Sequence, residues 1–266
     1  MRAPGLRFIL VSALALLGLH MLLLASSAPV ERHLRIRADI PPTRIVLLSD
    51  LHVAIPGDSP ARLRATVAQV NRLHPDLVLI AGDFLSTGSL ALPASPADAV
   101  APLAGLRAPL GTVAVLGNHD DHDRKALQAL LPRVGVTLLE NQAARRGPFA
   151  IVGIGDSFTR HARPAEALAA ARPLGGLPIA LAHEPDVTPE LDPSLRIVLA
   201  GHTHCGQIAP WPVGPLFTAS AYGHRYACGI VREGDRTVVV TAGLGTSNLP
   251  LRLGAQPDLW VIDLGR

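Results

Sequence analysis

The chain has 266 residues, of which 48% are hydrophobic, so it can bury a sizeable core, and we expect one soluble domain. Its formal net charge is only +3, it has no long basic run, and aromatic residues make up 3% of it. Nucleic-acid-binding surfaces need basic patches or aromatic stacking platforms, so nucleic acid is excluded as the main partner. The two cysteines, Cys205 and Cys228, could pair in an oxidising compartment, but we expect two small buried thiols.

Residues 1–28 contain a nearly uninterrupted apolar run from Leu6 to Ala25. About 20 apolar residues can cross a bilayer as a helix, whereas the core of a signal peptide usually has about 7–15. We therefore expect an uncleaved anchor in the inner (plasma) membrane, with export by a cleaved signal as the alternative because residues 26–28 are small. Arginines precede the run at positions 2 and 7 and follow it at 32, 35 and 37, so the positive-inside rule leaves the membrane side open.

Residues 29–42 are polar and end in proline, and we expect a linker there, followed by a folded domain over residues 43–266. The domain starts with the apolar run 45–48, which is typical of a strand buried on both faces. A helix is predicted over residues 59–73, with Ser59 as its N-cap and Pro60 in its first turn.

Apolar runs and helical patterns then alternate along the rest of the chain. Further strands are predicted over residues 77–81, 112–116, 136–139, 150–154, 179–182, 196–200, 226–232, 237–241 and 259–262. Helices are predicted over residues 124–131 and 164–171, and a loop leading into a weak helix over residues 86–100. This alternation predicts an α/β domain with a mixed sheet.

Five of the predicted strands are followed directly by side chains that can bind metals. In α/β sheets the carboxyl ends of the strands are where ligands bind. Solvated loops and turns are a poor explanation for five such strand ends, most of which also have a neighbouring glycine. In chain order the side chains are Asp50 with His52, Asp83, Asn118 with His119 and Asp120, His183, and His202 with His204.

The residue types in this set indicate the class of metal. Cysteine pairs with zinc-finger spacing are absent from the sequence, which excludes a closed thiolate site. Asp, His and Asn ligands suit Mn, Fe, Zn, Co or Ni, and their oxygen atoms favour Mn²⁺. Seven of these groups, all but His119 and Asp120, are counted as ligands, and seven are too many for one ion with an open position. They suit two ions that lie about 3.5–4 Å apart and share a carboxylate. Such a site is net positive, which favours a phosphate substrate.

In this order and spacing, the motifs resemble those of the calcineurin-like metallophosphoesterase superfamily. The resemblance covers roughly residue 44 to the C-terminus and implies two mixed β-sheets packed face to face and flanked by helices, preceded here by the N-terminal hydrophobic helix. Residues 201–207 and 243–252 resemble one branch of small membrane-anchored bacterial enzymes, which includes hydrolases of UDP-2,3-diacylglucosamine in lipid A biosynthesis. The motifs are Asp50-x-His52, Gly82-Asp83, Gly117-Asn118-His119-Asp120, His183 and Gly201-His202-x-His204.

The resemblance also implies a role for each motif residue. It implies a first metal bound by Asp50, His52 and His204, a second bound by Asn118, His183 and His202, and Asp83 as the ligand that bridges both. His119 would protonate the leaving group and Asp120 would orient it, while a metal-bound hydroxide would attack phosphorus.

The expected function is therefore metal-dependent hydrolysis of a phosphate ester or phosphoanhydride at a membrane, on a lipid-linked or nucleotide-sugar substrate such as UDP-2,3-diacylglucosamine. The alternatives are a broad phosphomonoesterase, phosphodiesterase or nucleotidase. A non-enzymatic sensor of phospho-ligands is disfavoured because every ligand position is filled. Two further features stay open: Arg252 could contact phosphate or support the structure, and the proline-rich loop around Trp211 could enter the bilayer, cover the site or simply pack.

Overall fold

A computed structural model describes residues 4–55, 57–87 and 92–266 of the chain. The second helix begins as predicted, because the Ser59 side chain accepts a hydrogen bond from the backbone N–H of Arg62 and Pro60 occupies the first turn. The α-helices of the described residues are α1 (Pro4–Ala25), α2 (Pro60–Arg72), α3 (Pro96–Val100), α4 (Arg124–Leu130) and α5 (Pro164–Ala171).

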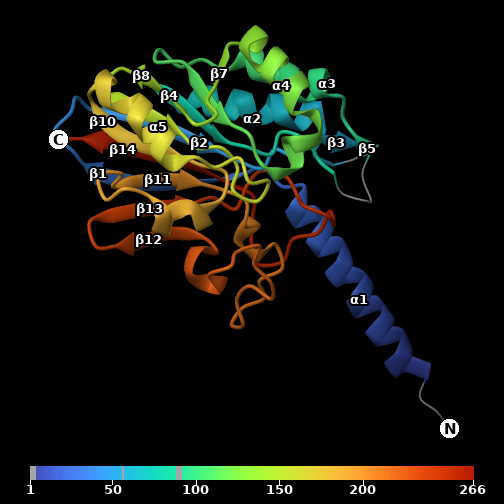
Figure 1. The fold of residues 1–266 in the computed structure, drawn as a ribbon. Helices are drawn as coiled ribbons and strands as arrows, with labels where there is room; N and C mark the ends of the chain where they lie inside the picture. Colours follow the sequence, from blue (N-terminus) through green and yellow to red (C-terminus); the bar gives the residue numbers. More distant parts are fainter. Residues whose placement is uncertain (1–3, 56, 88–91) are drawn as a thin grey trace.

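The strands of the described residues form two six-stranded mixed sheets and one small two-stranded sheet (Figure 1). The first sheet has the order β1 (Val30–Arg37), β14 (Asp258–Gly265), β2 (Thr43–Leu48), β4 (Leu77–Ala81), β6 (Thr112–Val115) and β7 (Val136–Leu138). The second has the order β12 (Gly229–Glu233), β13 (Arg236–Val240), β11 (Ile197–Ala200), β10 (Leu177–Leu181), β9 (Phe149–Gly153) and β8 (Gln142–Arg146). The small two-stranded sheet pairs β3 (Ala54–Ile55) with β5 (Leu92–Pro93) in antiparallel orientation.

The two sheets pack face to face, as predicted. The central strands of the first sheet are buried on both of their faces. In β2, Ile45 and Leu47 belong to the core between the sheets. The alternate residues Val46 and Leu48 belong to the core beneath α2, α3 and α4. On the far side, α5 packs against the second sheet through a third core. Burial on both faces explains why these strands appear in the sequence as continuous apolar runs.

The predicted linker over residues 29–42 was wrong for most of its length. Residues 30–37 form β1, an edge strand that pairs in parallel with β14 over its whole length. Leu34 and Ile36 alternate with exposed charged residues and pack against the core between the sheets. This period of two is the signal of a half-buried strand, and the arginines between the apolar residues concealed it.

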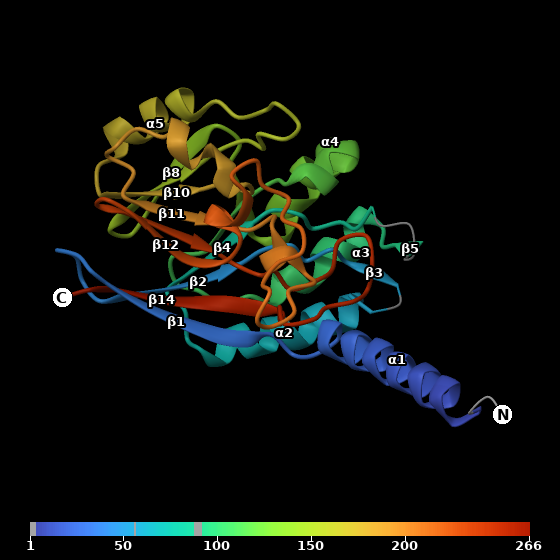
Figure 2. The same ribbon diagram turned by 90° about the horizontal axis from the view of Figure 1, so that it is seen from below.

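Helix α1 projects away from the sandwich (Figures 1 and 2). Residues 7–25 are long and apolar enough to cross a membrane, and almost all of this segment is exposed. Its last turn is nevertheless attached to the folded domain, since the Met21 carbonyl accepts from the Arg252 backbone N–H at 3.1 Å. The Arg62 guanidinium donates to the carbonyls of Ala25 and Ser27 at 3.1 and 2.9 Å. The Ala25 carbonyl is one of those that a helix C-terminus leaves without an intrahelical partner, and Ser27 lies just beyond the end of α1.

Candidate metal centre

The predicted ligands converge at the carboxyl ends of strands from both sheets. Asp50 and His52 follow β2, Asp83 follows β4, Asn118 follows β6, His183 follows β10, and the two remaining histidines follow β11. A first group consists of Asp50, His52 and His204, whose candidate ligand atoms all lie within 4.8 Å of one another. The two histidine Nε2 atoms are 3.1 Å apart, and His204 Nε2 lies 3.4 Å from Asp50 Oδ1.

A second group surrounds His183. Its Nε2 lies 3.1 Å from Asn118 Oδ1 and 3.1 Å from His202 Nδ1. Asp83 lies between the two groups, because its Oδ2 is 3.3 Å from His183 Nε2 and 3.5 Å from His52 Nε2. The structure thus brings the seven candidate ligands close together, with Asp83 between the group around His52 and the group around His183.

In two of the imidazole rings, the nitrogen that faces away from the centre contacts a backbone carbonyl. His52 Nδ1 lies 3.1 Å from the Leu85 carbonyl, and His183 Nδ1 lies 2.7 Å from the Ala81 carbonyl. A carbonyl can only accept, so Nδ1 donates in both rings, and a neutral ring then presents the Nε2 lone pair to the centre. This is the tautomer that binds a divalent metal, and the donor set therefore fits such an ion.

Burial and charge separate the protonation states of these groups. Burial lowers the pKa of His52 to about 4 and that of His202 to about 3, so both rings are neutral at neutral pH. Burial works against the charged forms of Asp83 and His183 too, but their mutual attraction outweighs it. This attraction holds the pKa of Asp83 well below the usual range of an aspartate and raises the pKa of His183 well above the usual value of a histidine. Burial raises the pKa of Asp50 to about 6.

Five of the seven candidate ligands have a left-handed backbone, which side-chain-bearing residues seldom adopt. Their φ angles run from 42° to 71°. Backbone strain of this kind costs about 1 kcal/mol or more per residue and is concentrated at functional sites. The left-handed conformation turns the chain sharply at each of these residues, directly after the strand. The five residues are Asp50, His52, Asp83, His202 and His204.

The glycines of the motifs allow these segments to approach one another. A Cβ atom at Gly117 would overlap the Asp83 carboxylate, and one at Gly201 would overlap Ser49 and Asp50. Any larger residue at either position would displace a candidate ligand.

His119 and Asp120 make contacts that differ from the expected pair. Asp120 was predicted to orient His119, but its carboxylate accepts backbone N–H groups from Gly117, Phe84 and Leu85 at 2.9–3.1 Å. It therefore fastens the loop after β4 to the loop after β6. The side chain that contacts His119 Nδ1 is Thr87, which no motif in the sequence had marked.

The His119 ring stands edge-on to the ring of His52, with centroids 4.7 Å apart. Its imidazole also falls within a possible metal-binding group with His52 and Asp83. The His119 ring therefore lies directly beside two of the candidate ligands, His52 and Asp83.

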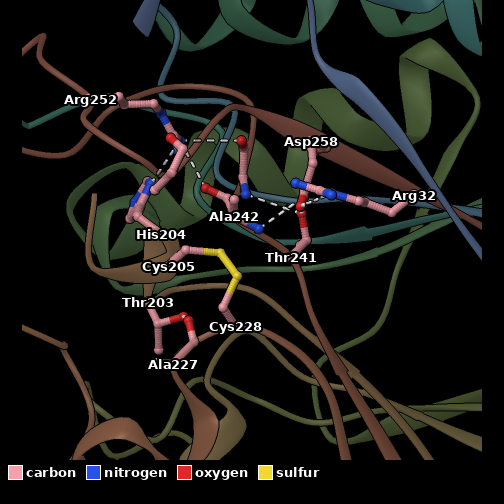
Figure 3. The surroundings of a disulfide bond; sticks show 12 residues. Arg32, Thr203, His204, Cys205, Ala227, Cys228, Thr241, Ala242, Arg252 and Asp258 are labelled. Carbon is pink, nitrogen blue, oxygen red and sulfur yellow. Dashed lines mark hydrogen bonds and ion pairs between the residues drawn. A yellow bond between two sulfur atoms is a disulfide. The ribbon is translucent and has the colours of Figure 1, made fainter. Parts of the chain in front are cut away.

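Arg252 supports the site from behind and is fully buried. Its guanidinium donates to the backbone carbonyls of Ala242, Gly243, Gly245 and Ala255. It also lies 3.4 Å from His204 Nδ1. Figure 3 shows Arg252 beside Ala242 and His204. Of the two roles considered for Arg252, the contacts support the structural one. Glycines 243 and 245, which it holds in place, pack directly against Asp50 and His52.

Glu184 is a buried carboxylate beside the site that the motif analysis did not select. Its Oε1 lies 3.6 Å from His202 Nε2, and its Oε2 accepts a hydrogen bond from Ser157. Burial and the neighbouring Asp156 raise its pKa to about 7. Because the ring of His202 presents Nδ1 to His183, Glu184 faces the opposite nitrogen and is placed to orient the ring. The signal available in the sequence was its position directly after His183.

The expectation of two free thiols was wrong, because Cys205 and Cys228 form a disulfide (Figure 3). Their Cα atoms are 4.7 Å apart although 23 residues separate them. The Thr203 hydroxyl donates to the Ala227 carbonyl at 2.8 Å and brings the segment after β11 next to the start of β12. This pairing depends on the path of a long loop, which the sequence spacing does not reveal.

Comparison with known proteins identifies the arrangement. The family described as "Calcineurin-like phosphoesterase" matches residues 43–206. The chain is 30% identical over 235 residues to "Transmembrane protein with metallophosphoesterase domain" of Danio rerio, covering 81% of this chain and 52% of that protein. It is 30% identical over 284 residues to the Bos taurus protein of the same name, covering 96% and 61%. It is 29% identical over 235 residues to "Uncharacterized metallophosphoesterase YkuE" of Bacillus subtilis, covering 83% and 78%.

Proposed function

This chain belongs to the calcineurin-like phosphoesterase family, and we propose that it uses two divalent metal ions to hydrolyse a lipid-linked or nucleotide-sugar phosphate at a membrane. The observation that carries the proposal is the position of Asp83, whose Oδ2 lies within 3.5 Å of one histidine from each ligand group. A carboxylate shared between two sets of ligands is the arrangement that suits a pair of ions.

Each ion would be held by one group. The first group is Asp50, His52 and His204, the second is Asn118, His183 and His202, and Asp83 would be shared. Two divalent ions would supply the positive charge that binds phosphate oxygens and activates water, and the oxygen ligands favour Mn²⁺ among Mn, Fe, Zn, Co and Ni.

The remaining residues position and protonate the substrate. His119 stands at the edge of the centre with Nδ1 engaged by Thr87, which leaves Nε2 to give a proton to the leaving oxygen. Asp120 keeps the His119 segment in place through the backbone, and its contacts support a positioning role.

The membrane part of the proposal is supported by α1. The bonds from Arg62 to the carbonyls of Ala25 and Ser27 favour an uncleaved anchor over a cleaved signal, because cleavage near residue 28 would remove both acceptors. An anchored enzyme reaches membrane-embedded substrates at high local concentration. UDP-2,3-diacylglucosamine is one candidate of the class that carries both acyl chains and a phosphoanhydride.

A substrate panel tests the proposal. The full-length chain in nanodiscs with Mn²⁺ would be assayed on UDP-2,3-diacylglucosamine, phospholipids, free nucleotides and an aryl phosphate. We expect hydrolysis of at least one compound, with acylated substrates hydrolysed about tenfold or more faster than their deacylated counterparts. Equal rates on the two kinds would favour a broad phosphomonoesterase or nucleotidase. No turnover on any compound with any of the five metals would contradict the proposal.

A further inference from the structure

Residues 208–217, which we call the hydrophobic loop, form an exposed apolar projection between β11 and β12. Trp211 is 92% exposed and Phe217 is 74% exposed, and Val213 and Leu216 are exposed beside them. Proteins that remain in water seldom leave so many large apolar side chains together at the surface, and such patches usually mark a contact with a membrane or a partner.

The chain segments that form and flank the hydrophobic loop carry no charged side chain. From residue 205 to residue 223 the sequence contains no Asp, Glu, Lys, Arg or His. The neighbouring segment 243–251 is equally free of charge and carries the exposed Leu249. These two segments could therefore enter a less polar medium without the desolvation of an ionised side chain of their own, which is the most costly step in such a transfer.

The backbone of the loop is also suited to a medium that is poor in water. Three of its ten residues are prolines, at positions 210, 212 and 215, and these have no N–H group to satisfy. The N–H groups of Ala209, Gly214 and Leu216 donate to backbone carbonyls at 2.7–3.0 Å. Unsatisfied backbone groups are what usually keep irregular loops out of lipid.

Hydrogen bonds connect the hydrophobic loop to the base of α1. The Arg252 N–H donates to the Met21 carbonyl of the helix, and the next residue, Leu253, accepts from Ala209 of the loop. Figure 1 shows the loop between β11 and β12 and the helix projecting from the same side of the sandwich. A bilayer crossed by α1 would therefore face the loop.

We propose that the hydrophobic loop, together with Leu249, inserts into the interfacial layer of the bilayer that α1 crosses. Trp is enriched in that layer in membrane proteins, because its ring is apolar and its N–H is polar. The loop starts four residues after the candidate ligand His204. Insertion of the loop would hold the metal centre over the headgroups, where a lipid phosphate lies. With α1 as the only contact, the domain could turn relative to the membrane surface. The contact itself rests on α1 being in the membrane and not on the catalytic proposal.

Fluorescence tests the insertion without any assay of activity. The chain has two tryptophans, Trp211 and the largely buried Trp260 of β14. The full-length protein would be placed in phosphatidylcholine vesicles with plain or brominated acyl chains, the latter being quenchers confined to the bilayer. We expect strong quenching of the wild type and almost none in Trp211→Phe, which retains only Trp260. Equal quenching of the two proteins would overturn the proposal. So would full access of Trp211 to acrylamide in the water, or protection from both quenchers, which would indicate a protein partner.

Activity provides a second test. Phe217→Ser with Leu216→Ser should slow hydrolysis of a vesicle-embedded phospholipid about tenfold, because the centre loses its orientation, and should leave an aryl phosphate unaffected. Ile230→Ser removes an exposed apolar side chain from β12, outside the loop, and should change neither rate. Equal slowing on both substrates would mean that the loop supports the fold instead. If no substrate is hydrolysed, the catalytic proposal fails and the fluorescence result still decides on the loop.

The disulfide carries a second inference, about the side of the membrane. Cys205 and Cys228 enclose residues 206–227, so the disulfide closes the base of the segment that contains the hydrophobic loop. Disulfides persist in secreted and periplasmic proteins and are rare in the reducing cytosol. We infer that the phosphoesterase domain lies on the oxidising side of the membrane and the N-terminus on the cytoplasmic side. The arginines do not decide the orientation, because Arg2 and Arg7 lie at one end of the apolar run and Arg32, Arg35 and Arg37 follow it at the other.

Thiol alkylation and reporter fusions test the orientation. The full-length chain would be produced in a bacterial host with a periplasm, precipitated with acid and treated with a maleimide of high mass. We expect no shift without prior reduction and a shift of two labels after it. A C-terminal alkaline phosphatase fusion should be active and a C-terminal green fluorescent protein fusion dark. Two alkylated thiols without reductant, or the opposite reporter pattern, would overturn the inference.

Discussion

Asp83 Oδ2 lies 3.3 Å from His183 Nε2, and both side chains are buried. Without metal the two form an ion pair, since the pKa of His183 is raised well above its usual value and that of Asp83 is depressed. The site therefore carries a proton on a nitrogen that a metal would need, and this couples metal binding to pH.

Metal binding should release protons. A divalent ion must displace the proton of His183 at neutral pH, and below about pH 6 it must also displace one from Asp50, whose pKa is about 6. Affinity for Mn²⁺ should therefore rise with pH, by about tenfold per pH unit near pH 7 and more steeply below pH 6. Calorimetric titrations in buffers of different ionisation enthalpy would measure the protons. Binding without proton release at pH 7 would contradict the predicted His183–Asp83 pair.

Asn118→Ala should act through the metal. Asn118 Oδ1 lies 3.1 Å from His183 Nε2, and its loss should weaken one metal about 10–100-fold. All aryl phosphates should then be hydrolysed more slowly by a similar factor, and excess Mn²⁺ should restore the rate. A loss that depends on the leaving group would point to a role other than coordination.

His119→Ala should act through the leaving group. General acid assistance is worth about 10²–10⁴-fold and matters most for poor leaving groups. The variant should retain its metals and show a steeper dependence of rate on leaving-group pKa across a series of aryl and alkyl phosphates. His122→Ala, which changes an exposed neighbour on the same 3₁₀ segment, serves as the control. Loss of metal from His119→Ala would instead assign it to coordination, as its grouping with His52 and Asp83 allows.

The position of β1 predicts where the chain can be shortened. A protein of residues 28–266 lacks α1 but retains β1 and should be folded and soluble. A protein of residues 43–266 would expose the edge of β14 and lose the contacts of Leu34 and Ile36, worth about 1–3 kcal/mol each. Thermal unfolding of the two proteins measures the difference. Equal stability would mean that β1 contributes nothing to the fold.

The sequence pointed to the candidate ligands because their signal is local. A buried strand appears as an apolar run, and the residue that follows it, such as Asp83 after β4, must lie at the sheet edge where other strand ends meet. The capped start of α2 was predicted for the same reason, since the Ser59–Pro60 pair is visible in a few residues. The division of the ligands into two groups and the face-to-face packing of two sheets came only from the resemblance to the metallophosphoesterase superfamily.

What the sequence did not predict depends on long-range geometry or on the backbone. The partners of Asp120 are N–H groups of two loops, and no residue type identifies an N–H. The disulfide and the contact of Arg252 with His204 join segments that only the folded chain brings together. The left-handed backbone of Asp50 is imposed by the fold and leaves no trace in composition. The strand β1 was missed for a different reason, because its period of two was visible but lay among arginines.

The most direct test of the two-metal account is the metal content and activity of Asp83→Asn. The full-length wild type, freed of metal and titrated with Mn²⁺, should bind about two ions per chain and reach full activity on an aryl phosphate only with the second. Asp83→Asn removes the shared anionic ligand, so both sites should lose about 10–100-fold in affinity and the activity should fall with them. Asp235→Asn, in the exposed turn between β12 and β13, controls for the substitution itself. An Asp83→Asn protein that binds two Mn²⁺ and hydrolyses the substrate like the wild type would contradict the account.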